Sequence, residues 1–126
     1  MNISSFPPSL REEPYIFLDT EVSNDRIRLV QLGGKEDIFI LDLFALGEEG
    51  VLFLRELLSS KGIVGQNLKF GLMYIYNYGI EPYADFDTMI ASQLLGDTDK
   101  HSLQKVAMHY LGQVWTRRKE RLLKKY

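Results

Sequence analysis

The sequence predicts an α/β domain in which helices cover a mixed β-sheet. Three short segments of β-forming residues follow one another with tight connections in the first third of the chain. Helical and strand-like patterns then alternate up to residue 112. The chain has 126 residues, of which 45% are hydrophobic, and this is enough for one domain with a single apolar core. Together these observations predict a layered α/β architecture.

The first part of the chain is expected to form an antiparallel meander. Residues 1–13 contain a Pro-Pro pair and are expected to be an irregular lead-in. A short apolar strand then ends at Asp19, and the second strand stops at a Gly-Gly turn signal. The three strands are expected at residues 15–18, 26–32 and 37–43.

The remainder is expected to alternate between helices and strands. Apolar residues recur on one helical face between residues 48 and 59, and residues that cap helices precede the later helical segments. Glycines follow these segments, as is common after a helix C-terminus. Helices are expected at residues 48–59, 68–79, 88–95 and 103–111, with N-caps at Asn67, Asp87 and Ser102, and strands at residues 62–65 and 83–86.

Charge is distributed unevenly along the chain. Residues 1–100 carry 16 acidic residues against 8 Lys and Arg, a net charge of −8, whereas residues 101–126 carry 1 against 7, a net charge of +6. The helix-prone tail, residues 113–126, is therefore either a nucleic-acid handle or a solvated terminal helix. A third alternative is a protein partner that packs on Leu122 and Leu123.

The composition bears on the compartment of the protein. The chain has no cysteine, which excludes disulfides and thiolate metal sites. It has neither an apolar run long enough to span a membrane nor a secretion signal at its start. We therefore expect a cytoplasmic protein without a membrane partner.

Two carboxylates follow the first predicted strand, at Asp19 and Glu21. Residues i and i+2 of a strand point to the same side and lie roughly 6–7 Å apart. A pair placed in this way suits hard cations such as Mg²⁺. The alternative is that two acids simply end a strand in solvent.

The segment Gly-Gln-Asn-Leu-Lys-Phe-Gly, residues 65–71, runs from a buried strand into a helix. It resembles the second motif, and Phe-Leu-Asp-Thr-Glu at residues 17–21 resembles the first motif, of the 3′–5′ exonuclease domain of DNA polymerase I-type enzymes and of ribonuclease D, the ribonuclease-H-like DEDD family. The resemblance covers residues 14–112. It implies a three-layer domain whose mixed sheet has an antiparallel meander followed by parallel strands, with helices on both faces. Further segments fit in the same order at residues 26–32, 86–92 and 101–103.

The resemblance also implies a chemistry and a partner. The family binds a single-stranded 3′ end, and two divalent ions, Mg²⁺ or Mn²⁺, flank the terminal phosphodiester. By matched position, Asp19 would bridge both ions and Glu21 would hold one of them. Thr20, Asn67 and Lys69 are the implied nucleic-acid contacts, with DNA favoured over RNA.

The chain departs from the family pattern at two places. Gly71 stands where the second motif has a metal-binding aspartate, either because the site has drifted or because the space is needed. The third motif, Tyr or His followed four places on by Asp, is absent, and the only acid after Asp99 is Glu120. Asp85 or Asp87 would have to replace the missing ligands.

Three functional hypotheses follow from these departures. The first is a nucleic-acid-binding exonuclease-like domain with lost or weak hydrolysis, to which Arg117, Arg118 and Lys119 add phosphate contacts. The second is an active 3′–5′ exonuclease that a partner completes. The third is a truncated structural or interaction relic without a nucleic-acid role.

Overall fold

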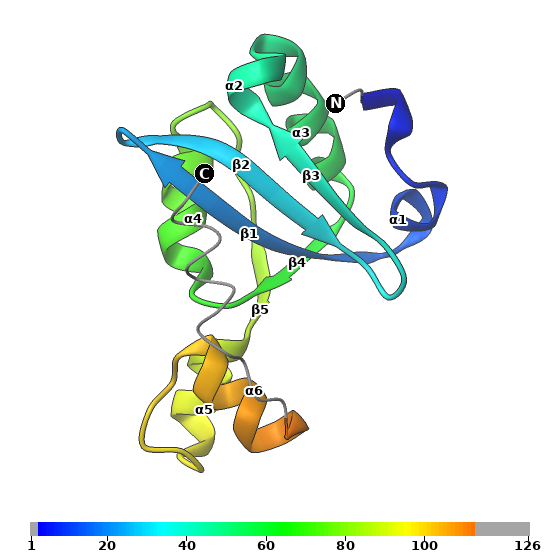
Figure 1. The fold of residues 1–126 in the computed structure, drawn as a ribbon. Helices are drawn as coiled ribbons and strands as arrows, with labels where there is room; N and C mark the ends of the chain where they lie inside the picture. Colours follow the sequence, from blue (N-terminus) through cyan, green and yellow to red (C-terminus); the bar gives the residue numbers. More distant parts are fainter. Residues whose placement is uncertain (1–2, 113–126) are drawn as a thin grey trace, which may run out of the picture. The chain divides into compact units, whose positions relative to one another are not determined.

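The computed structural model describes residues 3–112, which form two compact units (Figure 1). The division falls after Asp87, so that the units are Met1–Asp87 and Thr88–Tyr126. The basic tail, residues 113–126, lies outside the described residues. The predictions for Arg117, Arg118, Lys119, Leu122 and Leu123 lie outside them too.

The first unit is built on a mixed five-stranded sheet of strand order β3-β2-β1-β4-β5. β1 pairs antiparallel with β2, and β2 with β3, whereas β1–β4 and β4–β5 are parallel pairs. The meander and the later parallel strands are therefore as predicted. The strands are β1 Tyr15–Ser23, β2 Arg26–Gly33, β3 Ile38–Asp42, β4 Gly62–Gly65 and β5 Ala84–Asp87.

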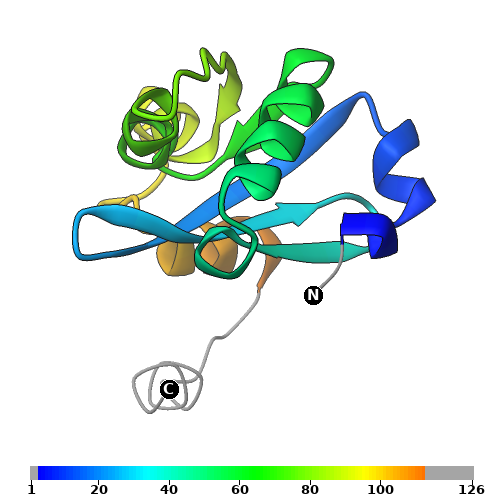
Figure 2. The same ribbon diagram turned by 90° about the horizontal axis from the view of Figure 1, so that it is seen from above.

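The hydrophobic core of this unit lies between the sheet and two helices on one of its faces. α3 (Glu48–Ser59) and α4 (Leu68–Tyr76) both lie on this face, as Figure 2 shows. Buried residues of α3 belong to one cluster with alternate residues of the strands. α3 and β4 have the bounds that the sequence predicts. The core residues contributed by α3 and β1 are Phe53, Leu54, Leu57, Leu58, Ile16 and Leu18.

A short helix, α2 (Leu43–Leu46), follows β3 directly. The Asp42 carboxylate accepts hydrogen bonds from the backbone N–H groups of Phe44 at 3.0 Å and Ala45 at 3.1 Å. This N-cap ends the strand, because it satisfies the first free amides of a helix. The prediction that the strand continues through Leu43 is therefore wrong.

The N-terminal segment is packed, and its expected irregular structure is also wrong. It contains a 3₁₀ helix, Ile3–Ser5, and α1, Pro8–Glu12. Phe6 and Leu10 are buried in the core, and Lys61 Nζ donates hydrogen bonds to the carbonyl oxygens of Arg11 and Glu13, each at 2.6 Å. A proline at the start of a helix lacks only an N–H that would be unpaired there, so the Pro-Pro pair does not exclude a helix.

β1 is longer than the sequence predicts, since it runs past Asp19 to Ser23. A two-residue turn joins it to β2, and both turn residues, Asn24 and Asp25, have positive φ angles of 52° and 59°. Turns of this kind match the twist of a hairpin, and Asn and Asp tolerate the conformation. Asp19 and Glu21 therefore lie within a strand and not after its end.

The second unit contains α5 (Thr88–Leu95) and α6 (Leu103–Leu111), close to the bounds predicted for both. The Ser102 hydroxyl caps α6 by accepting a hydrogen bond from the Lys105 N–H at 3.4 Å. The hydroxyl of Ser92, a buried residue of α5, lies 2.5 Å from Nδ1 of His101 in the loop that leads to α6. No helix within residues 3–112 has both the length and the apolar character needed to cross a membrane.

Candidate functional site

The candidate site lies where the strand order reverses. From β1 the chain passes to β2 and β3 on one side of the sheet, and β4 and β5 lie on the other side. In open α/β sheets such a switch point leaves a crevice outside the carboxyl ends of the strands, and ligands bind there. The pairing of β1 with β4 ends at Phe17 and Val64. From Leu18 onward β1 is paired with β2 alone, and its edge toward β4 has no neighbouring strand among the described residues.

A small hollow of about 100 Å³ lies at this point. β1 and the segment that leads from β4 into α4 form its walls, and the structure thus brings the two motif segments together. The lining residues are Leu18, Asp19, Thr20, Gln66, Asn67, Leu68, Phe70 and Gly71.

The two acidic residues of the first motif share the exposed face of β1. Burial alternates along the strand, so Ile16 and Leu18 face the core while Asp19 and Glu21 face away from it. The Asp19 carboxylate accepts a hydrogen bond from the Thr20 N–H at 2.9 Å. Within the described part of the chain, Glu21 does not line the hollow, and Asp19 is the one acidic residue that does.

The Thr20 side chain occupies the space next to Gly71. A Cβ atom at Gly71 would lie 2.8 Å from Thr20 Oγ1 and 3.3 Å from Thr20 Cγ2. Contacts this short require one of the groups to move. Gly71 therefore leaves room for the Thr20 side chain where α4 passes β1, and this arrangement is compatible with both explanations considered from the sequence.

The N-terminus of α4 is capped from another strand. Asn67 holds the N-cap position with left-handed backbone angles (φ 52°, ψ 48°), and its side chain makes no capping hydrogen bond. The Asp87 carboxylate of β5 instead accepts from the N–H groups of Asn67 at 3.1 Å and Leu68 at 2.8 Å. Asn67 is therefore the N-cap residue that the sequence predicts, but the capping hydrogen bonds come from Asp87 and not from the Asn67 side chain. A carboxylate is also favoured here by the helix dipole.

The two acids of β5 are directed at backbone amides. Asp85 Oδ2 accepts a hydrogen bond from the Ile63 N–H at 2.7 Å, and Asp87 binds the α4 terminus. Among residues 3–112, no group of three or more Asp, Glu, His or Cys side chains is arranged to hold a metal ion. The described residues do not fit a pair of divalent ions, because Asp19 and Glu21 supply two carboxylates against a charge of +4. Two carboxylates would suffice for a single Mg²⁺, which commonly completes its octahedron with waters and substrate phosphates.

Lys69 lies apart from the hollow at Asp19. It lines a larger groove of about 690 Å³ on the outer side of α4. Of the residues expected to contact nucleic acid, Thr20 and Asn67 line the hollow and Lys69 lines the groove. Phe70 and Gln66 also line the hollow, although the sequence reasoning did not select them. Their positions within the second motif were the only available signal.

Asp87→Ala is expected to destabilise the protein by about 1–2 kcal/mol, because two backbone amides lose a charged acceptor. Equilibrium unfolding in urea, followed by circular dichroism, measures the change. Asp99→Ala is the control, since it removes an acid of the loop between α5 and α6. Equal losses in the two variants would contradict the capping role of Asp87.

Comparisons with known proteins agree with this arrangement. A family model described as 3′-5′ exonuclease matches residues 3–126. The chain is 50% identical over 103 residues to DNA polymerase I of Aquifex aeolicus, a match that covers 82% of this chain and 17% of the polymerase. It is 32% identical over 101 residues to ribonuclease D of Gluconacetobacter diazotrophicus, covering 72% of this chain and 25% of that protein. The chain thus spans only a small part of each relative.

Solved structures show the same fold. Escherichia coli RNase D superposes with a TM-score of 0.73 at 22% identity, covering 90% of this chain and 32% of that one. Brucella melitensis NrnC bound to pGG also gives a TM-score of 0.73, at 25% identity, covering 84% of this chain and 56% of NrnC. The predicted α/β, ribonuclease-H-like fold is confirmed.

Proposed function

Because the chain belongs to the 3′–5′ exonuclease family, we propose that it binds the 3′ end of a single strand at the hollow beside Asp19 and has lost or weak two-metal hydrolysis. The family is generally dependent on divalent metal ions. Binding is assigned to the hollow because the two motif segments of the resemblance meet there. DNA is proposed as the preferred strand over RNA.

The observation that carries the weak-hydrolysis proposal is the number of carboxylates. Asp19 and Glu21 are the acids of the first motif, and Gly71 provides no ligand. The acids of β5 bind backbone amides. Two divalent ions carry a charge of +4, and two carboxylates neutralise half of it. Removing one group that stabilises the charge of a transition state typically slows an enzyme by about 10²–10³-fold.

The hollow supports binding through groups other than metal ligands. Gln66 and Asn67 bring side-chain amides to it, and Phe70 brings an aromatic ring. Amides donate hydrogen bonds to phosphate oxygens and base edges, and rings stack on bases. The N–H groups of Asn67 and Leu68 donate to Asp87, so the proposal assigns no phosphate to this helix terminus. Arg117, Arg118 and Lys119, which lie outside the described residues, are proposed to add phosphate contacts.

Titration of fluorescently labelled single strands by anisotropy, with EDTA present, tests the binding. The affinity is expected to fall roughly tenfold between about 50 and 200 mM salt, as two to three phosphate contacts predict. A linear oligonucleotide is expected to bind more tightly than a circular one of the same composition, which has no 3′ end. Absence of binding to either at low salt would end the proposal.

Incubation of the same linear strand with the protein and Mg²⁺ or Mn²⁺ tests the proposal of lost or weak hydrolysis. The expected result is slow or undetectable shortening from the 3′ end on a denaturing gel. Rapid metal-dependent degradation that Asp19→Asn abolishes would show a working nuclease and overturn the weak-hydrolysis proposal. Degradation that persists in Asp19→Asn would come from a contaminating nuclease or a different site, and it would not be evidence of catalysis at Asp19.

A further inference from the structure

The face of the sheet that points away from α3 and α4 carries large apolar side chains. Burial alternates along β1 and β3, and at one end of the sheet the residues that face away from the core are apolar. The solvated face of such strands is normally polar. Five exposed residues, here termed the sheet patch, depart from this rule. They are Tyr15 at 55% exposure, Phe17 at 52%, Ile38 at 76%, Ile40 at 43% and Phe86 at 53%.

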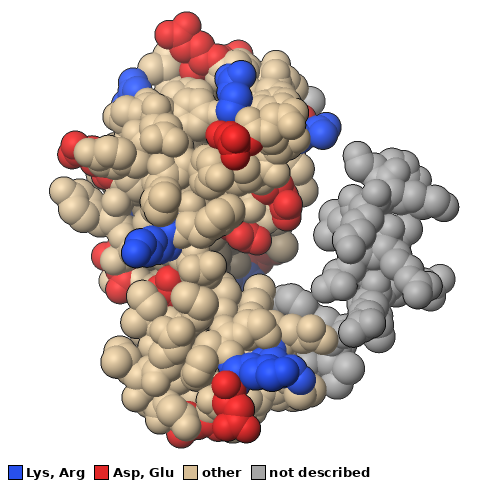
Figure 3. Space-filling model, turned by 90° about the vertical axis from the view of Figure 1, so that its left-hand side faces the viewer, with Lys and Arg blue, Asp and Glu red and all other residues tan. Residues whose placement is uncertain are grey.

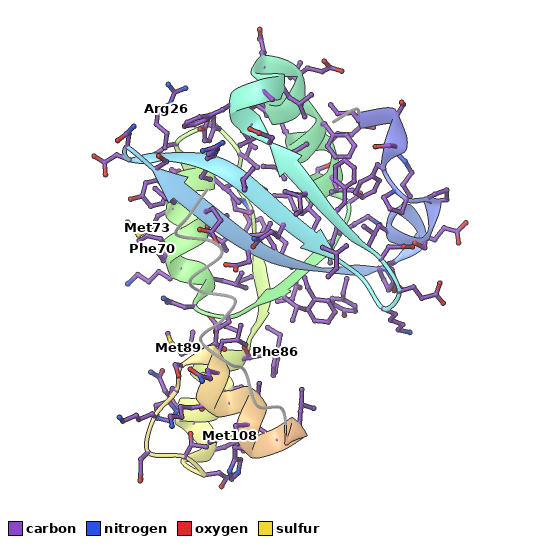
Figure 4. The ribbon with its side chains drawn as sticks, viewed as in Figure 1. Arg26, Phe70, Met73, Phe86, Met89 and Met108 are labelled. Carbon is purple, nitrogen blue, oxygen red and sulfur yellow. The ribbon has the colours of Figure 1, made fainter. Side chains whose placement is uncertain are left out.

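The register of the strands joins the sheet patch into one surface. Phe17 is paired with Gly33 of β2, and Gly33 with Ile38 of β3. On the other side Phe17 is paired with Val64 of β4, and Val64 with Phe86 of β5. Paired residues of neighbouring strands point to the same side of a sheet, so one row of uncharged residues crosses all five strands. Phe86, at the end of β5, is the last residue of this row (Figure 4).

Gly33 leaves a gap in the row. A Cβ atom there would lie 3.7 Å from Phe17 Cβ and 3.9 Å from Ile38 Cγ1, so a side chain would fit where none is present. One strand separates β1 from β3, which places Phe17 and Ile38 roughly 10 Å apart. Gly62, by contrast, is covered, because the Tyr15 ring lies over it. The sheet patch therefore has two protruding side chains with room for one more side chain between them.

The apolar area of the sheet patch matches that of a dimer interface. Its three half-exposed aromatic side chains and two isoleucines together present roughly 500 Å² of apolar surface, if a whole aromatic side chain presents about 200 Å². A standard interface buries about 800 Å² of each partner, and about 65% of a homodimer interface is apolar. The sheet patch alone therefore supplies the apolar part of one such interface.

The surroundings of the sheet patch favour a second copy as its partner. Asp19 and Glu21 follow on the same face of β1, so an anionic lipid surface would be repelled. Another side of the first unit has Lys, Arg, Asp and Glu scattered among its uncharged residues, as Figure 3 shows. The sheet patch itself has no charged residue. A surface with both a protrusion and a gap can complement its own copy about a two-fold axis.

We propose that the sheet patch is a two-fold interface between two copies of this chain, an inference that does not depend on the proposed function. The two sheets pack face to face, about 10 Å apart. The Ile38 side chain of each copy enters the gap at Gly33 of the other. Burial of apolar surface drives the association, and salt therefore does not weaken it.

Sedimentation equilibrium of the full chain tests the interface. At a concentration of about 100 µM, and in about 0.1 M as well as about 0.5 M salt, the wild type is expected to have roughly twice the 14.6 kDa mass of one chain. Ile38→Lys is expected to weaken dimerisation at least roughly a hundredfold, because the two-fold axis brings two unpaired charges into apolar surface. Met73→Lys is the matched control. It adds the same charge at an exposed residue on the outer side of α4, and dimerisation is expected to be unchanged (Figure 4).

Cross-linking locates the interface, since the chain has no cysteine of its own. A short bismaleimide is expected to join Ile38→Cys chains into covalent dimers, which are detected on a denaturing gel. Met73→Cys, treated in the same way, is expected to remain monomeric.

Three results would overturn the proposal. The first is a wild type that remains monomeric, and if Ile38→Lys then also lowers the urea midpoint of unfolding, another part of the same chain covers the sheet patch. The second is a dimer that Ile38→Lys does not weaken or that Met73→Cys captures as well as Ile38→Cys, because its interface lies elsewhere. The third is a dimer that dissociates at high salt, because opposite charges on the two copies would then hold it together.

Discussion

Gly65→Ala is expected to destabilise the protein by about 3 kcal/mol, an effect at the upper end for a single added methyl group. A Cβ atom at this residue would lie 2.5 Å from Leu68 Cδ2 and 2.7 Å from the carbonyl oxygen of Leu18. The Leu18 oxygen belongs to the backbone of β1, and Leu68 is buried in the core. Neither group is free to move, so the added methyl would push β4 and α4 away from β1.

Equilibrium unfolding in urea measures this loss, and Gly33→Ala is the control. A Cβ atom at Gly33, in β2 of the same sheet, would make only ordinary contacts of 3.7 Å to Phe17 and 3.9 Å to Ile38. That variant is expected to stay within about 0.5 kcal/mol of the wild type or to gain stability, because glycine weakens a strand. Equal effects of the two substitutions would contradict the close approach at Gly65.

The position of Gly65 links stability to the site. The chain turns from β4 into α4 immediately after this residue, and that turn forms one wall of the hollow at Asp19. Gly65→Ala is therefore expected to weaken binding of a single-stranded 3′ end even under conditions where the variant remains folded. Unaltered binding in a folded Gly65→Ala variant would mean that the hollow tolerates displacement of this wall.

Elements defined by local signals could be predicted from the sequence. The bounds of α3, β4 and α5 agree with the prediction because apolar periodicity and flanking turn residues act within a few residues. The prediction of an irregular N-terminal segment is wrong because the burial of Phe6 and Leu10 depends on residues that are distant in the sequence. The extension of β1 to Ser23 was not predicted for a similar reason, since pairing with β2 stabilises the residues that follow the apolar run.

The site was predictable only as far as its motif residues. The resemblance indicated that residues 17–21 and 65–71 belong together, and the structure places both at one hollow. It gave no sign that Asp87 caps α4, because the carboxylate and the amides it binds are separated by about 20 residues in sequence. The groove that contains Lys69 could not be predicted either, since a helical pattern does not show which exposed face of the helix borders a groove.

Gly71→Asp, which restores the residue type of the family motif, is expected to cost about 2–3 kcal/mol of stability on its own. The new Cβ would lie 2.8 Å from Thr20 Oγ1, and the carboxylate would enter the hollow that already holds Asp19. Thr20→Ala removes both of the close γ atoms, so that the nearest atom to the new Cβ is the Cβ of residue 20, at an ordinary distance of 3.7 Å. The double variant is therefore expected to recover most of the loss, and unfolding of the four proteins forms a double-mutant cycle. Strictly additive effects would contradict the contact between Thr20 and Gly71.

The same double variant tests whether a missing carboxylate limits metal binding. One additional negative charge about 4 Å from a divalent ion contributes roughly 2 kcal/mol in a water-like dielectric, or about 30-fold in affinity. Calorimetric titration is thus expected to show Mn²⁺ binding at least about tenfold tighter in Thr20→Ala/Gly71→Asp than in Thr20→Ala. Met73→Asp adds the same charge to α4 at a residue that lines the groove and not the hollow, so it should leave Mn²⁺ affinity nearly unchanged. If Met73→Asp strengthens binding as much as Gly71→Asp does, the ion responds to overall charge, and the geometry at Asp19 does not determine where it binds.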